Sequence, residues 1–162
     1  MISTSIFVYL LLKWALLGDM IINAYYFIVS AYGWYYWSMK KEGIIINPIT
    51  LTQSKEYKTC TRLFVASLLF VFCIYQVFDK WKDWTAYVDT LTTAIFFVGM
   101  WLMARRKLEN WLFWIVGDII SIPLYFYKGL TLTSIQYLIF TVIAIYGYRL
   151  WKKILYKSPP TS

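Results

Sequence analysis

The sequence has no histidine, and this absence excludes several classes of protein. Without histidine, the chain can build neither an imidazole acid–base catalyst nor a histidine-ligated metal site. The HExxH, GxSxG and glycine-rich phosphate-loop motifs are absent as well. The sequence therefore predicts a protein that is not an enzyme, with no catalytic residue, no metal and no cofactor.

Cysteine is scarce too, and the two cysteines do not suit a disulfide. Cys60 and Cys73 lie 13 residues apart in what reads as a single helix. At a rise of about 1.5 Å per residue, they are too far apart to bridge each other. We expect both to be unreactive thiols of an apolar segment.

The sequence has few charged residues and many apolar ones. Charged residues make up only 15% of the chain, whereas about a quarter of a soluble domain is charged. Of the 162 residues, 60% are hydrophobic and 22% are aromatic. A soluble domain of 19.3 kDa could not bury that much apolar surface. We therefore expect an all-α polytopic membrane protein with the lipid bilayer as its surroundings.

Five apolar runs are candidates to cross the bilayer, because a transmembrane helix needs about 20 apolar residues. They cover residues 18–38, 61–78, 84–104, 111–127 and 130–151. A further run, Ile2 to Leu12, is too short to span and resembles the end of a helix that started earlier. The chain thus reads as five spans preceded by an incomplete segment.

The net charge of +8 predicts an orientation rather than a nucleic-acid partner, because the basic residues cluster in the connections and no nucleic-acid-binding motif accompanies them. If successive loops alternate sides, one side carries Lys40, Lys41, Lys55, Lys58, Arg62, Arg105, Arg106, Lys107, Arg149, Lys152, Lys153 and Lys157. The other side carries Lys13, Lys80, Lys82 and Lys128. By the positive-inside rule, the C-terminus is cytoplasmic.

The run 111–127 carries the pattern most indicative of function. Trp111, Trp114, Asp118, Ser121 and Tyr125 recur at intervals of three and four, which places them on one helical face. A carboxylate at the middle of a span costs about 2.5–3.5 kcal/mol on insertion scales and usually faces a cavity. Aromatic rings beside a buried anion suit a flat cationic solute. Trp111 is close to the end of its span, so an interfacial anchor remains an equal alternative for it.

Two other runs repeat this polar and aromatic pattern. Asn23 and Trp37 lie on such a stripe in the run 18–38, and Asp89 begins one in the run 84–104. Three striped helices are enough to line a central cavity. Small residues such as Gly99 and Gly147 are read instead as sites of close packing between helices.

An internal repeat adds a constraint on the architecture. Residues 32–37, YGWYYW, match residues 146–151, YGYRLW, at an offset of 114. The two copies lie at an offset of four spans, an even number, so the repeats would be parallel. Each unit would then have three helices, although the abundance of aromatics leaves chance as an alternative.

Several motifs, taken together and in order, resemble the PnuC-type vitamin transporters. They are residues 109–121 (ENWLFWIVGDIIS), residues 31–37 (AYGWYYW) with Asn23, Val88-Asp89-Thr90, and residues 134–137 (SIQY) ahead of Tyr146-Gly147. The resemblance extends from Met1 to about Lys153. It implies a SWEET-like plan of two parallel three-helix units joined by a linker helix. It also implies facilitated diffusion of nicotinamide riboside, or of thiamine in a sister branch.

The resemblance divides the chain as follows. Residues 1–41 form a partial first unit without its first helix and part of its second, 42–60 a polar connection, 61–83 the linker helix and loop, 84–153 the second unit, and 154–162 a cytoplasmic tail. The missing first helix is one departure from the family pattern. Asp118 is a second, because many riboside carriers have asparagine at this position. An N-terminally short, non-transporting membrane fragment is the alternative of another class.

The resemblance also completes the predicted site. Substrate-binding residues are Trp114, Asp118, Trp111, Ser121, Asn23, Gln136 and Tyr137, and Tyr125, Asp89 and Trp37 are candidates for lining the cavity. The expected partners are a small cationic vitamin and a cytoplasmic kinase that traps it by phosphorylation in a bacterial inner-membrane setting. A homo-oligomer is compatible with the sequence.

Overall fold

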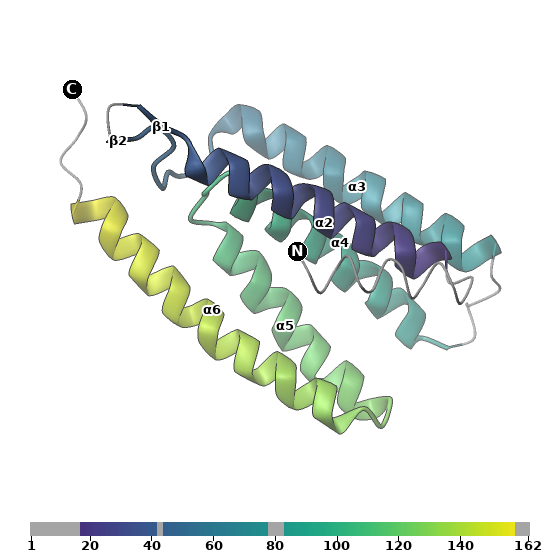
Figure 1. Ribbon diagram of the computed structural model, residues 1–162. Helices are drawn as coiled ribbons and strands as arrows, with labels where there is room; N and C mark the ends of the chain where they lie inside the picture. Colours follow the sequence, from purple (N-terminus) through teal and green to yellow (C-terminus); the bar gives the residue numbers. More distant parts are fainter. Residues whose placement is uncertain (1–16, 42–43, 78–82, 158–162) are drawn as a thin grey trace. The chain divides into compact units, whose positions relative to one another are not determined.

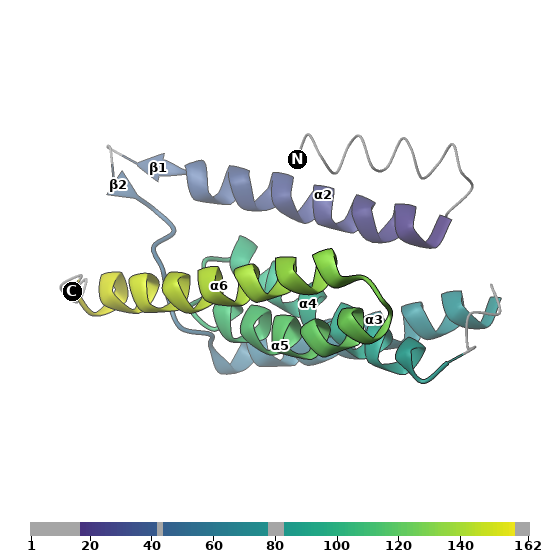
Figure 2. The same cartoon turned by 90° about the horizontal axis from the view of Figure 1, so that it is seen from below.

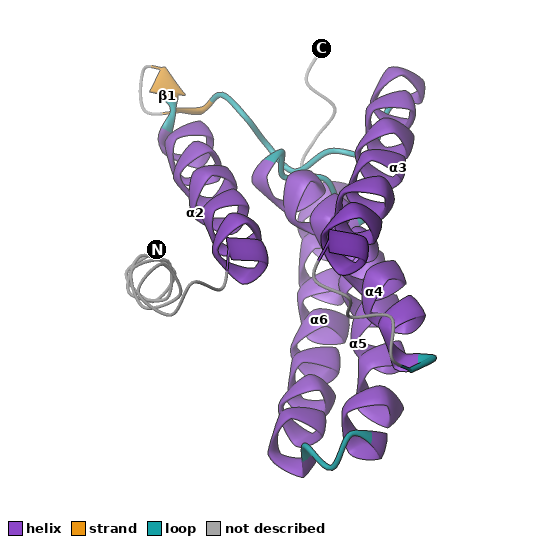
Figure 3. Ribbon diagram, turned by 90° about the vertical axis from the view of Figure 1, so that its right-hand side faces the viewer, coloured by secondary structure: helices purple, strands orange, loops and turns teal. Residues whose placement is uncertain are grey.

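The computed structural model describes residues 17–41, 44–77 and 83–157, and nearly all of them are helical (Figures 1 and 3). The helices are α2 (Leu17–Ser38), α3 (Ser54–Val77), α4 (Thr85–Ala104), α5 (Asn110–Tyr127) and α6 (Thr131–Lys157). The run Ile2 to Leu12 lies outside the described residues. The expectation of an all-α protein is confirmed; among the described residues, the only β structure is a ribbon of two two-residue strands and an isolated bridge between Thr50 and Lys107.

The chain divides into two compact units. The first comprises Met1–Pro48 with Ala104–Arg106, and the second comprises Ile49–Met103 with Lys107–Ser162. The second unit therefore groups α3 with α4, α5 and α6. In the first unit, β1 (Lys40–Lys41) pairs antiparallel with β2 (Ile44–Ile45) just after α2.

Within the first unit, α2 is tied to the segment Ala104–Arg106. Trp37 Nε1 donates to the Ala104 carbonyl at 3.0 Å, and Gly33 allows Ala104 to approach where a Cβ would be only 3.2 Å away. The Arg106 guanidinium lies 5.2 Å above the Trp37 ring and donates to the Asn47 carbonyl. Burial lowers the pKa of Arg106, which as an arginine stays charged.

In the second unit, α5 and α6 lie side by side and run in opposite directions (Figures 1 and 2). Ser134 Oγ on α6 donates to the Ile122 carbonyl of α5 at 2.8 Å. Such hydroxyl bonds hold apolar helices together, because lipid provides no hydrophobic force between them. A second contact region joins α3, α4 and α5 through Cys60, Val98 and Leu102, with Leu63, Phe64, Trp101 and Phe113 packed around them.

Two helix boundaries differ from the sequence prediction. α3 begins at Ser54 rather than at residue 61, because its polar first turn is capped: the Gln53 backbone N–H donates to Glu56 Oε2 at 2.9 Å. α6 continues to Lys157, beyond the predicted end at 151, and lysines suit a helix C-terminus. Hydropathy identifies only the apolar part of a helix, and the helix itself can continue beyond that part through capped or charged turns. Cys60 and Cys73 both lie in α3 as free thiols.

Three of the described helices are long and apolar enough to cross a membrane. They are Ser54–Val77, Thr85–Ala104 and Thr131–Lys157. The other two predicted spans are helical, but α5 is only 18 residues long and contains Asp118 and Pro123. For α2 and α5, crossing the membrane stays a prediction.

The N-terminus of α5 is fixed by a cluster that we call the N-terminal clamp, formed by Thr50, Thr52, Glu56, Lys107 and Glu109. Lys107 Nζ lies 2.8 Å from Glu56 Oε2 and 3.0 Å from Thr50 Oγ1. The Glu109 carboxylate accepts the Thr52 backbone N–H at 2.9 Å and its hydroxyl at 2.7 Å. The clamp thus joins the segment before α3 to the start of α5.

The C-terminus of α5 ends in a tight turn. Gly129 adopts a φ of +75°, which a glycine tolerates without strain. The Leu130 N–H donates to the Tyr125 carbonyl at 2.9 Å and the Gly129 N–H to the Phe126 carbonyl at 3.0 Å, so the turn is a Schellman motif. Lys128 is the C-cap. One turn earlier, Pro123 lies inside the helix and removes one backbone hydrogen bond.

Candidate functional site

The predicted face of α5 is turned into the second unit. Asp118 is 1% exposed and Ser121 is 0% exposed, and Asn110 at the start of the helix is 0% exposed. Trp111, Trp114 and Tyr125 are partly buried. The spacing of three and four therefore identified the buried side of this helix correctly.

Four polar atoms on this face have no hydrogen-bond partner within the described residues. They are Asn110 Oδ1, Trp111 Nε1, Trp114 Nε1 and Asp118 Oδ1. Buried polar atoms in proteins almost always have partners, and each exception asks for an explanation. The two oxygens are acceptors and the two indole N–H groups are donors, and all four lie along one helix. A polar solute bound there would supply their missing hydrogen-bond partners. Asp118 forms no ion pair with any described residue.

Ser121 takes part in this face through its oxygen rather than its proton. Its hydroxyl donates to the Gly117 carbonyl at 2.8 Å, so the proton is used inside α5. The oxygen lone pairs remain as acceptors one helical turn beyond Asp118.

Four aromatic rings from three helices form a continuous stack that we call the aromatic ladder: Trp114, Phe96, Tyr137 and Tyr125. The centroids of Trp114 and Phe96 are 5.4 Å apart, those of Phe96 and Tyr137 6.1 Å, and those of Tyr137 and Tyr125 5.1 Å. The interplanar angles are 29°, 12° and 18°, so the rings are stacked. Trp114 and Tyr125 are 11 residues apart, or roughly 16 Å along the helix axis. The ladder therefore extends along the helices.

Glycines make room for the rings of this region. A Cβ on Gly117 would overlap the Phe96 ring, and one on Gly147 would lie 2.6 Å from the Trp111 ring. Trp111 also packs edge-on against Trp151, with centroids 5.4 Å apart. The prediction that Gly147 serves close packing is confirmed. Trp111 packs against α6, and its alternative role as an interfacial anchor stays open.

The other predicted site residues are distributed unevenly. Tyr137 belongs to the ladder, but Gln136 is exposed, since neighbouring residues on a helix point about 100° apart. Asn23 and Trp37 lie on α2 in the first unit, and the Trp37 indole N–H is bonded to Ala104. Asp89 forms an ion pair with Lys128 near one end of the ladder.

Asn110, Phe96 and Lys128 were not among the predicted site residues. Asn110 lies within the motif of residues 109–121 but was not singled out. Phe96 lies on α4, and a phenylalanine in an apolar helix carries no signal of its own. Lys128 was counted only as a loop charge. Phe96 and Lys128 are recognised by their contacts across helices, which a linear sequence does not display.

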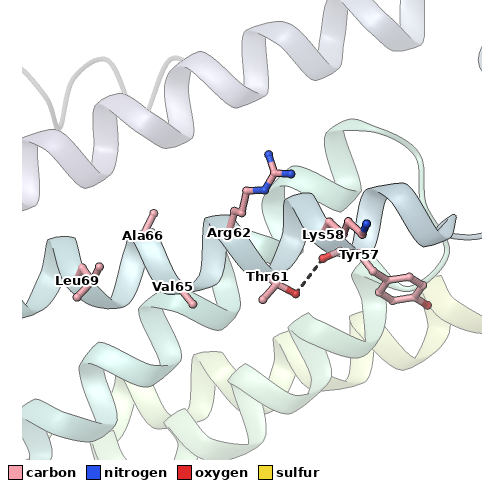
Figure 4. Close-up of a pocket in the computed structure, with 7 residues that line it drawn as sticks. All are labelled: Tyr57, Lys58, Thr61, Arg62, Val65, Ala66 and Leu69. Atoms are coloured by element: carbon pink, nitrogen blue, oxygen red, sulfur yellow. Dashed lines mark hydrogen bonds between the residues drawn. The ribbon is translucent and has the colours of Figure 1, made fainter.

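Two surface hollows offer no comparable arrangement. One, of about 630 Å³, is lined by α3 alone: Tyr57, Lys58, Thr61, Arg62, Val65, Ala66 and Leu69 (Figure 4). Another, of about 610 Å³, lies between α4 and α5 and is lined by Trp84, Val88, Ile119, Ile120, Pro123, Leu124 and Tyr127. Binding sites bring together polar groups from several elements, whereas the polar residues of the first hollow all come from one helix and the second hollow is mostly apolar. Within the described residues, no cluster of side chains suits a metal ion.

Comparison with known proteins identifies the family. The model of the nicotinamide mononucleotide transporter family matches residues 1–153. The chain belongs to this family. The nicotinamide riboside transporter PnuC of Escherichia coli is 22% identical over 174 residues, which cover 93% of this chain and 73% of that protein. The riboflavin/roseoflavin transporter RibM of Streptomyces davaonensis is 24% identical over 130 residues, covering 76% and 58% of the two chains.

A solved structure shares the fold. The crystal structure of the vitamin B3 transporter PnuC superposes with a TM-score of 0.62 at 21% identity, covering 98% of this chain and 71% of that one. The resemblance found in the sequence motifs is thereby confirmed. The protein is a multi-pass membrane transporter and not an enzyme. The SWEET-like repeat and the boundaries of its units stay predictions.

Proposed function

We propose that this protein carries nicotinamide riboside across the bacterial inner membrane by facilitated diffusion. The observation that carries the proposal is Asp118: a buried carboxylate with an unpartnered oxygen, one helical turn from a tryptophan at the end of an aromatic stack. A buried charge without a partner is costly, and a cationic solute would supply the missing partner. The names of the relatives PnuC and RibM agree with a vitamin as the cargo.

The chemistry of the cargo fits the residues of this face. Nicotinamide riboside carries a positively charged pyridinium ring, which Trp114 can stack on with a cation–π attraction of about 2 kcal/mol when desolvated. Asp118 would lie beside the charge. Asn110, Ser121 and the indole N–H groups can bond the amide and ribose hydroxyls. A phosphorylated product bears added negative charge, which this face repels, so a cytoplasmic kinase would trap the cargo.

Thiamine is the alternative cargo, favoured by the same residue. Its thiazolium is also a flat cation. Asp118 occupies a position at which many riboside carriers of the PnuC type have asparagine, and this departure from their pattern is what favours the alternative. A carboxylate distinguishes a cation from a neutral ring but not one cation from the other.

Uptake into proteoliposomes tests the proposal. We expect saturable uptake of one of the two cationic vitamins, with the neutral riboflavin as the comparison. Asp118→Ala removes the carboxylate and should abolish saturable uptake of the cation, a loss of at least tenfold, which corresponds to about 1.4 kcal/mol or more.

The matched control is Asp83→Asn, at an exposed carboxylate that accepts the neighbouring Trp84 N–H at 2.7 Å. It should transport like the unaltered protein. Unchanged uptake in Asp118→Ala, with the protein inserted normally, would show that the carboxylate does not carry the cargo. Transport of riboflavin alone would refute a cationic cargo.

A further inference from the structure

Tyr125, the ring at one end of the aromatic ladder, already has a cation over its face. Lys128 Nζ lies 5.5 Å from the centroid of the Tyr125 ring, and the same ammonium is paired with Asp89 Oδ2. Tyr125 in turn stacks on Tyr137, two rings away from Trp114. Asp118, next to Trp114 at one end of the ladder, has no cation among the described residues, whereas Asp89 at the other end is paired with one.

The backbone places this ammonium. Lys128 is the C-cap of α5, and Gly129 with its positive φ turns the chain immediately afterwards. The C-terminus of a helix carries partial negative charge, which favours a lysine there. Asp89 reaches the same point from the first turns of α4. Lys128 is therefore held at the ladder by the turn and the Tyr125 ring of α5 and by the Asp89 carboxylate of α4.

We propose that Lys128 controls access to the aromatic ladder: its ammonium occupies, on Tyr125 and beside Asp89, the place that a cationic solute must take before it moves along the rings. The inference rests on the proposed function in taking the cargo to be cationic. An arriving cation exchanges with the ammonium, so Asp89 and the Tyr125 ring keep a positive partner throughout. A neutral ring has no such exchange to make.

The pair is suited to exchange because water reaches it. The Lys128 side chain is 26% exposed and that of Asp89 is 17% exposed. Ion pairs in contact with water are weak, since solvent compensates each charge when they part. A long flexible lysine can swing into solvent without moving the backbone.

Accessibility of a thiol on the face of α5 that carries Trp114 and Tyr125 tests the proposal without any vitamin. In a protein with Cys60→Ala and Cys73→Ala, Ser121→Cys introduces a single thiol one turn below Tyr125. A cationic trimethylammonium methanethiosulfonate and the neutral methyl methanethiosulfonate are added to intact cells. Adding Lys128→Met should raise the rate of labelling by the cationic reagent about tenfold. The rate of labelling by the neutral reagent should rise less than twofold.

Two further variants serve as controls. Lys128→Arg keeps the charge and should label like the parent. Lys152→Met removes another ammonium that lies over an aromatic ring, 5.9 Å from the Tyr148 centroid, and should have no effect. Because salt at 0.5 M screens a general surface field to a few ångströms, an effect of Lys128→Met that persists there comes from the occupied position itself. Equal labelling with and without the Lys128 charge, or an effect lost in salt, would overturn the proposal.

Vitamin influx supplies the second arm. Lys128→Met should raise the initial rate of cationic uptake several-fold and leave the affinity measured in detergent unchanged, whereas Asp89→Asn should lower the rate. An unchanged rate in both variants would overturn the access role even if the vitamin is carried. If no cationic vitamin is carried at all, the proposed function fails, and the labelling rates alone decide the role of Lys128.

Discussion

The two ends of α5 are each held by a lysine and a carboxylate, but the two arrangements differ in how many partners support them. In the N-terminal clamp, Lys107 is only 8% exposed in its side chain and contacts Glu56, Thr50 and the Leu51 carbonyl. Lys128 is more exposed and rests on one carboxylate and one ring. The first arrangement suits a permanent joint, and the second suits a contact that opens.

This difference indicates where the transporter is rigid. The clamp also includes Glu109, whose carboxylate holds both the backbone and the hydroxyl of Thr52, and the Leu108 N–H donates to the Thr50 carbonyl at 3.0 Å. Such multiple bonds fix the N-terminal end of α5, from which Trp114 and Asp118 are positioned. Stability measurements on variants of each end can therefore confirm or refute the contrast.

The largest loss should come from Lys107→Met. It removes the cation of a mostly buried pair, so that the Glu56 carboxylate and Thr50 Oγ1 both lose their contact with the ammonium. Because Glu56 keeps some contact with water, we expect a loss of about 2–3 kcal/mol rather than the full cost of a buried charge. Thermal unfolding in detergent measures it, with the exposed Lys153→Met as the control. A loss below that of Lys128→Met would reverse the comparison.

Glu109→Gln should rank second. The amide keeps one acceptor for Thr52 but loses the charge that strengthens both hydrogen bonds, so we expect a loss of about 1–2 kcal/mol. The same unfolding assay applies, and Asp83→Asn is the control. If the variant were as stable as the parent, the clamp would depend on Lys107 alone.

Gly129→Ala tests the turn at the other end. A Cβ at Gly129 meets no atom within 4 Å, so the cost is that of the positive φ alone, about 1–2 kcal/mol. Gly129→Asn should recover part of this loss, because asparagine tolerates that conformation better. Equal losses for alanine and asparagine would indicate a steric cause.

Lys128→Met should have the smallest effect on stability, within about 0.5 kcal/mol, because exposed ion pairs contribute little. The same variant should have the largest effect on cationic labelling of the thiol in Ser121→Cys. A stability loss as large as that of Lys107→Met would show that the pair is a structural joint.

The sequence predicted the helices well because each apolar run reports directly on burial in lipid or protein. It missed the ends of α3 and α6, where capping by Glu56 and a lysine-rich last turn extend helices that hydropathy cuts short. The buried face of α5 was also predictable, since the positions of Trp114, Asp118 and Ser121 relative to one another depend on helix geometry alone.

Contacts between helices were beyond the sequence. Gln136 and Tyr137 were both expected at the site, but only the rotation of α6 against α5 decides which of the two points inward. Phe96 joins the ladder because Gly117 leaves space for its ring. Lys107 was counted with the topology charges, and its pairing with Glu56 depends on how the segment before α3 folds back.

Pro123 gives α5 a mechanical property. Its missing N–H leaves the Ile119 carbonyl without the usual donor, which weakens the helix at this turn. The weakened turn separates the half that bears Trp114 and Asp118 from the half that ends at Lys128. If Lys128 changes partners, this turn would allow the C-terminal half of α5 to tilt while the half fixed by the N-terminal clamp keeps its position.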